Sequence, residues 1–117
     1  MNVKTINDVA IVYSDEIIIK DTQSAVDFIM SIKYETNCNK IAINKEAIIE
    51  NFFILSSGIA GEILEKFITY KTKFAIYGDY SKYTSKPLKD FIYESNNGID
   101  IFFVATEDEA VKMLGKE

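Results

Sequence analysis

The sequence predicts a single α/β domain over residues 1–117, with a mixed sheet of four or five strands, an opening β-hairpin, and helices mainly on one face. Two β-rich runs, Val3–Ile6 and Val9–Tyr13, are separated only by the turn residues Asn7 and Asp8. Beyond the hairpin, segments with helical periodicity alternate with short apolar runs. Such alternation implies parallel strands joined by right-handed crossovers.

The helices are predicted from apolar spacing and from residues that favour helix ends. Asp21 can cap the first helix, and Asn37 marks its end. Pro87 is tolerated because it falls in the first turn of the third helix. The predicted starts, in chain order, are Asp21, Ser56, Thr84 or Ser85, and the capping box that begins at Thr106.

The remaining strands are short, apolar and bounded by polar residues. Ile41–Ile43, Phe74–Tyr77 and Ile101–Ala105 fit buried strands of a parallel sheet. Ile17–Ile19 is a candidate extension of the sheet. The pattern of Lys45–Leu55 is ambiguous and is compatible with a helical turn.

The composition restricts the chemistry that the chain can perform. The net charge is −5, all 13 cationic side chains are lysines, and the sequence contains no histidine or arginine. Without histidine there is no ordinary general base near neutral pH and no imidazole metal ligand. An acidic chain also lacks the field that drives nucleic-acid binding. We therefore expect no catalysis, no metal, no cofactor and no nucleic-acid partner.

The same sequence predicts a cytoplasmic protein that does not enter a membrane. Cys38 is the single cysteine and cannot form an internal disulfide, which fits a reducing compartment. The first residues do not have the pattern of a secretory signal, and no apolar run is long enough to cross a bilayer.

Residues 55–62 read L-S-S-G-I-A-G-E and form the first candidate site. A hydroxyl of Ser56 or Ser57 at a helix N-terminus would face unpaired N–H groups and the positive end of the helix dipole. A phosphoryl group there would be stabilised and would change the surface charge. The simpler interpretation is that one serine caps the helix, while Gly58, Ala60 and Gly61 allow it to approach the sheet closely.

The loop Gly78–Ser85 is the second candidate site. It leaves the end of a buried strand, where ligand crevices form in open α/β sheets. Asp79, Ser81 and Ser85 could bind a small polar ligand, and Lys82 or Lys86 could balance an anion. Alternatively, the glycine makes the turn, the aspartate bonds neighbouring amides and the last serine caps the next helix.

Two further polar groups are given no functional role. Ser95 and Asn96, at the end of the third helix, are interpreted as polar packing, with the asparagine bonding an adjacent loop. A catalytic pair of Ser57 and Lys66 is excluded within one helix, because their positions are about 13 Å apart along the axis.

The stretch Phe53–Ile59 follows the strand Ile41–Ile43, and this order resembles the STAS domain, the fold of bacterial anti-sigma-factor antagonists. Those antagonists carry a phosphorylatable serine in an Asp-Ser-Ser-Gly motif at the start of the second helix. Here Leu55 stands in place of the acid, and the segment before the motif is a few residues longer. The resemblance implies a regulatory domain in which Ser56 or Ser57 accepts the phosphoryl group.

Over nearly its whole length, the chain resembles a bacterial family known as domain of unknown function 4180. That family has no established activity to carry over. The segments that carry the resemblance are Phe52-Phe53, Gly58–Glu62, Lys66-Phe67, Tyr70, Ala75–Asp79, Ser81, Ser85 and Phe91–Asn96.

The sequence thus predicts a non-catalytic regulatory or protein-interaction module of bacterial origin. The alternative is a domain that binds a small polar or anionic ligand through Gly78–Ser85. A protein partner is expected, and two chains could form a homodimer through the strand edge Val3–Ile6. Tyrosine is enriched at interfaces, which supports partner binding by the loop. The predicted surface consists of Ser56, Ser57, Gly58, Asp79, Tyr80, Ser81, Tyr83 and Ser85.

Overall fold

Five strands form one sheet in the order β1-β2-β3-β4-β5 in this computed structural model, which describes residues 1–115. The strands follow one another in the sheet in the order in which they occur in the chain. Their bounds are β1 Asn2–Ile6, β2 Val9–Tyr13, β3 Lys40–Asn44, β4 Lys73–Tyr77 and β5 Ile101–Val104. The α-helices are α1 Thr22–Thr36, α2 Ile59–Thr69, α3 Lys86–Asn96 and α4 Glu107–Leu114.

The predicted hairpin and parallel strands are confirmed. β1 and β2 pair antiparallel through a two-residue turn in which Asn7 and Asp8 have φ values of 51° and 65°. Positive φ at both central residues is typical of a type I′ turn, which matches the twist of a hairpin. The pairs β2–β3, β3–β4 and β4–β5 are all parallel.

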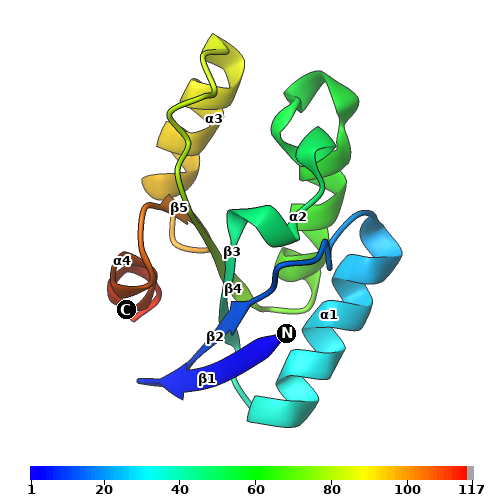
Figure 1. Ribbon diagram of the computed structural model, residues 1–117, viewed down its shortest axis with the longest axis vertical. Coiled ribbons are helices and arrows are strands. Elements are labelled where there is room, and N and C mark those ends of the chain that lie inside the picture. The colour runs from blue at the N-terminus through cyan, green and yellow to red at the C-terminus, as the bar shows by residue number, and fades with distance from the viewer. Residues whose placement is uncertain (116–117) are drawn as a thin grey trace.

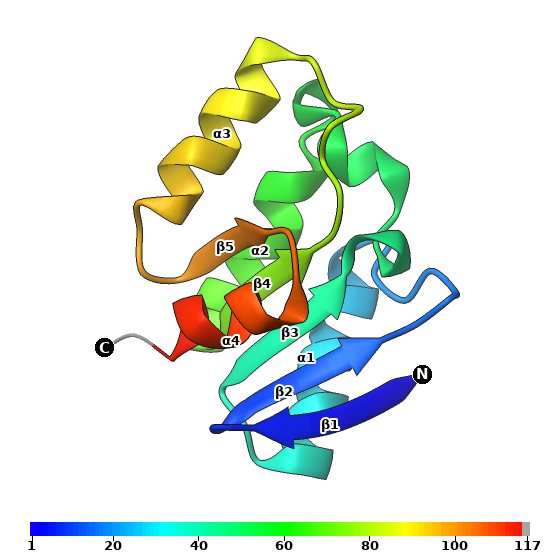
Figure 2. The ribbon, with the colours of Figure 1, turned by 60° about the vertical axis from the view of Figure 1, so that its left-hand side comes forward.

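The two faces of the sheet carry different numbers of helices. Ile41 and Ile43 of β3 point into the larger core with α1 and α2, whereas Ala42 between them belongs to a smaller core under α4. Figure 1 shows α1 and α2 on one side of the sheet and α4 on the other, and Figure 2 shows the sheet with α4 in front. The expected arrangement, with helices mainly on one face, is confirmed.

Side chains cap the helices at three of the predicted positions. Asp21 accepts from the Ser24 N–H at 2.8 Å, and the Ser24 hydroxyl accepts from the Asp21 N–H at 3.0 Å, which completes a capping box. Ser85 accepts from the Leu88 N–H at 3.4 Å at the start of α3. Thr106 accepts from the backbone of α4 in the same way. Local residue types therefore determine where these helices begin.

The segment between β3 and α2, whose sequence pattern was ambiguous, holds helical turns of the 3₁₀ type. It consists of three 3₁₀ turns, η1 Lys45–Ala47, η2 Glu50–Phe53 and η3 Leu55–Ser57. Ile17–Ile19 does not extend the sheet, because only Ile19 forms a bridge, and it pairs with Ile48 in this irregular segment. Short 3₁₀ turns leave no clear periodic pattern in a sequence.

Helix α3 packs beside β5, and its last residue bonds the backbone of Phe103 at this edge of the sheet. The Asn96 amide donates to the Phe103 carbonyl at 3.0 Å and accepts from the Phe103 N–H at 2.7 Å. The asparagine therefore bonds a strand rather than the adjacent loop that the sequence suggested. Within residues 1–115, none of the helices has the length and apolar character needed to span a membrane.

Candidate functional site

The carboxyl ends of β3 and β4 bring two candidate segments together. Lys45 follows β3 and Gly78 follows β4, and these strands are neighbours in the sheet. A Cβ on Gly78 would lie only 2.8 Å from the Lys45 Cβ, so a glycine is needed for the close approach. Figure 1 shows that α2 and α3 also begin at this end of the molecule.

A cluster of aromatic side chains packs the loop after β4 against the 3₁₀ segment. The rings of Phe53 and Tyr83 stack with centroids 5.1 Å apart, and Tyr80 lies 6.0 Å from Phe53. Tyr80 is also 5.9 Å from Phe103 of β5 in an edge-on arrangement. The rings therefore hold the loop against both the irregular segment and the sheet.

Polar groups make a second connection between the same two segments. The Tyr83 hydroxyl donates to Glu50 at 2.7 Å, and the Lys45 ammonium donates to that hydroxyl at 3.3 Å. Lys82 forms an ion pair with Glu50 at 3.4 Å. Lys45 is only 8% exposed, and its ammonium lies 5.1 Å from the Tyr83 ring centroid, within reach of a cation–π interaction.

These contacts shift the pKa values of the groups involved. Burial raises the pKa of Tyr83 above its ordinary value, and the hydrogen bond to Glu50 raises it further. Burial would also raise the pKa of Glu50. The hydrogen bond from Tyr83 and the nearby Lys82 ammonium outweigh that effect, so the pKa of Glu50 is lowered. Glu50 is therefore ionised at neutral pH and holds the loop in place.

A crevice of about 350 Å³ lies between the irregular segment and the start of α3. Its walls combine apolar side chains with hydroxyl groups and one ammonium group. The lining residues are Phe53, Ile54, Leu55, Ser56, Lys82, Tyr83, Thr84, Ser85, Pro87 and Leu88. Three residues of the predicted surface therefore meet here, namely Ser56, Tyr83 and Ser85, together with the candidate anion-binding Lys82.

The two candidate serines have different environments. Ser57 donates to the Asn51 carbonyl at 2.9 Å and accepts from the Ile59 N–H at 3.2 Å. Ser56 is exposed and lines the crevice. Neither serine occupies the N-cap of α2, because Gly58 holds that position with a φ of 79°. The helix starts at Ile59 rather than Ser56, since Ser56 and Ser57 belong to a 3₁₀ turn.

The glycines of the L-S-S-G-I-A-G-E stretch do not bring α2 close to the sheet. Gly58 is needed for its positive φ, and a Cβ there would meet only the Glu62 carboxylate at 3.8 Å. A Cβ on Gly61 would meet nothing within 4 Å, because this glycine is exposed on the outer face. Only Ala60 is buried against the core, so the close-packing interpretation is wrong for both glycines.

The loop after β4 contributes to two separate hollows rather than one. Asp79 accepts from the Ser81 N–H at 2.8 Å, and this bond lowers the pKa of the Asp79 carboxyl. Asp79, Gly78 and Tyr80 line a hollow at the ends of β4 and β5, whereas Ser85 lines the crevice. Asp79 and Ser81 therefore form a local turn, and they do not line the crevice that Ser85 reaches.

Three residues important for this site were not identified from the sequence: Lys45, Glu50 and Phe53. They lie in the 3₁₀ segment, whose pattern was ambiguous. Lys45 directly follows a buried strand, so the rule that sites form at the carboxyl ends of parallel strands could have indicated it. Within residues 1–115, no group of three or more His, Cys, Asp or Glu side chains is arranged to hold a metal ion.

The fold defines the structural class of the protein. A hairpin followed by parallel strands that helices connect is a STAS-like arrangement. The structure is similar to the crystal structure of a putative anti-sigma factor antagonist from Thermotoga maritima. The TM-score is 0.51 at 16% sequence identity, and the match covers 98% of this chain and 94% of that chain. At this identity the likeness shows the fold alone.

The sequence places the chain in a particular family within that class. The family described as "Domain of unknown function (DUF4180)" matches residues 4–114, so the chain belongs to this family. None of the curated proteins matches the sequence significantly. The expected family and the expected fold are both confirmed.

Proposed function

We propose that this protein is a non-catalytic regulatory module of the cytoplasm that binds a protein partner at the crevice between the 3₁₀ segment and α3. An anti-sigma factor antagonist acts by binding another protein, and the shared fold makes a protein partner the first candidate. Fold similarity alone does not determine function, so the surface must supply the argument.

The main support for this proposal is the exposed side chain of Ile54 at the crevice. Its side chain is 51% exposed although it lies among Phe53, Leu55 and Leu88, which are buried or half-buried. Interface cores combine apolar side chains with a few polar groups. The crevice has both, because hydroxyl-bearing side chains and Lys82 line it together with the isoleucine.

Ser56 is the residue that would control binding. Its exposed side chain lines the crevice, so a phosphoryl group there would add negative charge to the contact surface. The Ser57 hydroxyl already donates and accepts a hydrogen bond, and its modification would disturb the start of α2. Ser56 is therefore the better phosphoacceptor of the two.

The test is partner capture from extracts of the source cells with two matched variants. Ile54→Asp places a charge at the crevice, and Ile68→Asp does the same on α2, where the isoleucine is 47% exposed and does not line the crevice. We expect Ile54→Asp to weaken capture of one specific protein at least about tenfold, which corresponds to 1.4 kcal/mol. Ile68→Asp should retain capture.

Ser56 variants test the control of binding in the same assay. Ser56→Asp mimics the phosphoryl charge and should reduce capture, whereas Ser56→Ala should bind as the unmodified protein does. Equal capture by Ile54→Asp and Ile68→Asp would contradict partner binding at the crevice. Loss of capture with both Ser56 variants would indicate that the hydroxyl is a contact and not a switch.

The second candidate function is binding of a small polar or anionic ligand by the loop Gly78–Ser85. Lys82, Thr84 and Ser85 line the crevice, and the α3 N-terminus adds free N–H groups. The capture experiment separates the two functions, because a small-ligand site does not require Ile54 to contact a protein.

A further inference from the structure

The two edge strands of the sheet, β1 and β5, differ in whether another segment bonds their outward backbone groups. At β5, the Asn96 amide occupies the outward N–H and carbonyl of Phe103, at 2.7 Å and 3.0 Å, and α3 packs alongside. At β1, no other segment of residues 1–115 pairs with the outer edge. An open edge presents unpaired backbone donors and acceptors to another strand.

The hairpin register shows which backbone groups of β1 are free. In a two-residue hairpin, the residues that flank the turn exchange both hydrogen bonds, and bonded and non-bonded pairs then alternate along the strands. Ile6 pairs with Val9, and Lys4 pairs with Ile11, so these residues bond β2. The N–H and carbonyl groups of Val3 and Thr5 therefore point outward.

We propose that the outer edge of β1 binds the same edge of a second copy of this chain. The strands run antiparallel about a two-fold axis at Lys4, and each Val3 exchanges its hydrogen bonds with the partner's Thr5. This register satisfies the outward groups of both residues on both chains. It joins two five-stranded sheets into one continuous sheet, and it does not depend on the proposed function of the crevice.

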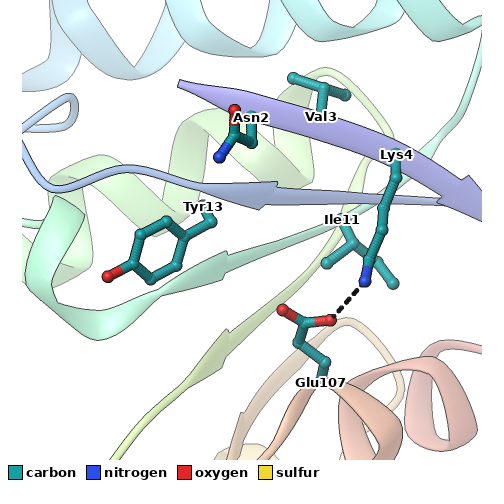
Figure 3. Close-up of a pocket in the computed structure, with 6 residues that line it drawn as sticks. All are labelled: Asn2, Val3, Lys4, Ile11, Tyr13 and Glu107. Carbon is teal, nitrogen blue, oxygen red and sulfur yellow. Dashed lines mark ion pairs between the residues drawn. The ribbon is translucent and has the colours of Figure 1, made fainter.

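Lys4 does not oppose this pairing in the way that an edge lysine usually does. A lysine on an edge strand normally discourages strand addition. Here the Lys4 ammonium forms an ion pair with Glu107 of α4 at 3.0 Å. Figure 3 shows Lys4 reaching away from β1 toward α4, with Val3 on the opposite side of the strand. Glu107 thereby neutralises the charge that would face the partner's Lys4.

The side chains beside the edge also match in this register. Val3 lies opposite the partner's Thr5, and pairs of β-branched residues stabilise neighbouring strands. Asn2 lies opposite the partner's Ile6, a residue that is 41% exposed in the single chain. Asn2 also lines a hollow of about 360 Å³ between the hairpin and α4, so the partner's Ile6 would pack at its rim.

Sedimentation equilibrium of the full chain tests the association. Thr5→Pro removes the outward N–H, and an edge strand tolerates proline where its N–H faces solvent, whereas Thr5→Val keeps the N–H and the β-branched shape. We expect the unmodified chain and Thr5→Val to form dimers as concentration rises, and Thr5→Pro to remain monomeric with an unchanged circular dichroism spectrum. A chain that is monomeric at every concentration overturns the proposal, as does an equally dimeric Thr5→Pro.

Disulfide cross-linking tests the register independently, in a Cys38→Ser background. The two Lys4 positions form a non-hydrogen-bonded pair with Cα atoms about 4.5 Å apart, which a disulfide can bridge. Oxidised Lys4→Cys should give a covalent dimer. Thr5→Cys should not, because the two Thr5 positions are more than about 7 Å apart in this register. Cross-linking through Thr5→Cys, or through neither position, overturns the proposed register.

Discussion

Gly78 shows how a single residue shapes the candidate site. It follows β4 directly, and its lack of a side chain lets the loop pass against Lys45. The sequence marks this glycine as a turn residue, but only the tertiary structure shows what it approaches. The buried lysine that it contacts belongs to the network with Tyr83 and Glu50, so the glycine supports the wall of the crevice.

Alanine at position 78 should therefore destabilise the protein. The added Cβ would lie 2.8 Å from the Lys45 Cβ, and overpacking of this kind costs about 1–3 kcal/mol. Gly61→Ala is the matched control, because its Cβ meets nothing within 4 Å and alanine favours a helix by about 0.5–1 kcal/mol. Urea denaturation measures both free energies of unfolding. A Gly78→Ala variant as stable as the parent would contradict the proposed close approach.

At the scale of elements, one side chain supplies the hydrogen bonds between α3 and β5, beside the apolar packing of Phe91 on Phe103. Asn96 ends the helix and uses its amide to complete the edge of the strand through Phe103. The sequence indicates a polar residue near the inner face of the helix, but it does not reveal the partner. The contact joins residues of two elements that are separated by a loop, and loop conformation determines whether they meet.

Replacing Asn96 by alanine should weaken the attachment of α3. The Phe103 N–H and carbonyl lose their partners, and an unsatisfied half-buried pair costs about 1–3 kcal/mol. Asn97→Ala should change the stability by less than about 0.5 kcal/mol, because this side chain is exposed and bonds only the Tyr93 carbonyl of its own helix. Hydrogen exchange at the Phe103 amide gives a second readout. Equal protection in both variants would contradict the role of Asn96.

At the scale of the whole molecule, three tyrosine hydroxyls donate hydrogen bonds at the carboxyl edge of the sheet. Tyr77 donates to the Val12 carbonyl at 2.9 Å, Tyr80 to the Ile76 carbonyl at 2.7 Å, and Tyr83 to Glu50. Burial is the main cause that raises the pKa of each hydroxyl above its ordinary value of 10.0. All three therefore stay protonated in the folded protein at a pH where they ionise in the unfolded chain.

The protein should lose stability at alkaline pH for this reason. Because the folded-state pKa values are raised, the stabilisation is fully present below pH 10 and decreases as the pH rises above that value. An absorbance titration of the seven tyrosines should show a late component in native protein that disappears in denaturant. Tyr83→Phe should reduce that component. Identical native and denatured titrations would contradict the expected burial of these hydroxyls.

The sequence by itself determined the order of the strands and α-helices, because local physics sets them. The Asn7-Asp8 turn, the Asp21 and Ser85 caps and the alternation of apolar periods each act over a few residues. Only the tertiary structure decided that Ser56 lines the crevice, whereas the Ser57 hydroxyl donates a hydrogen bond to the Asn51 carbonyl. The irregular 3₁₀ segment owes its shape to long-range contacts with the loop after β4, and no local pattern encodes such contacts.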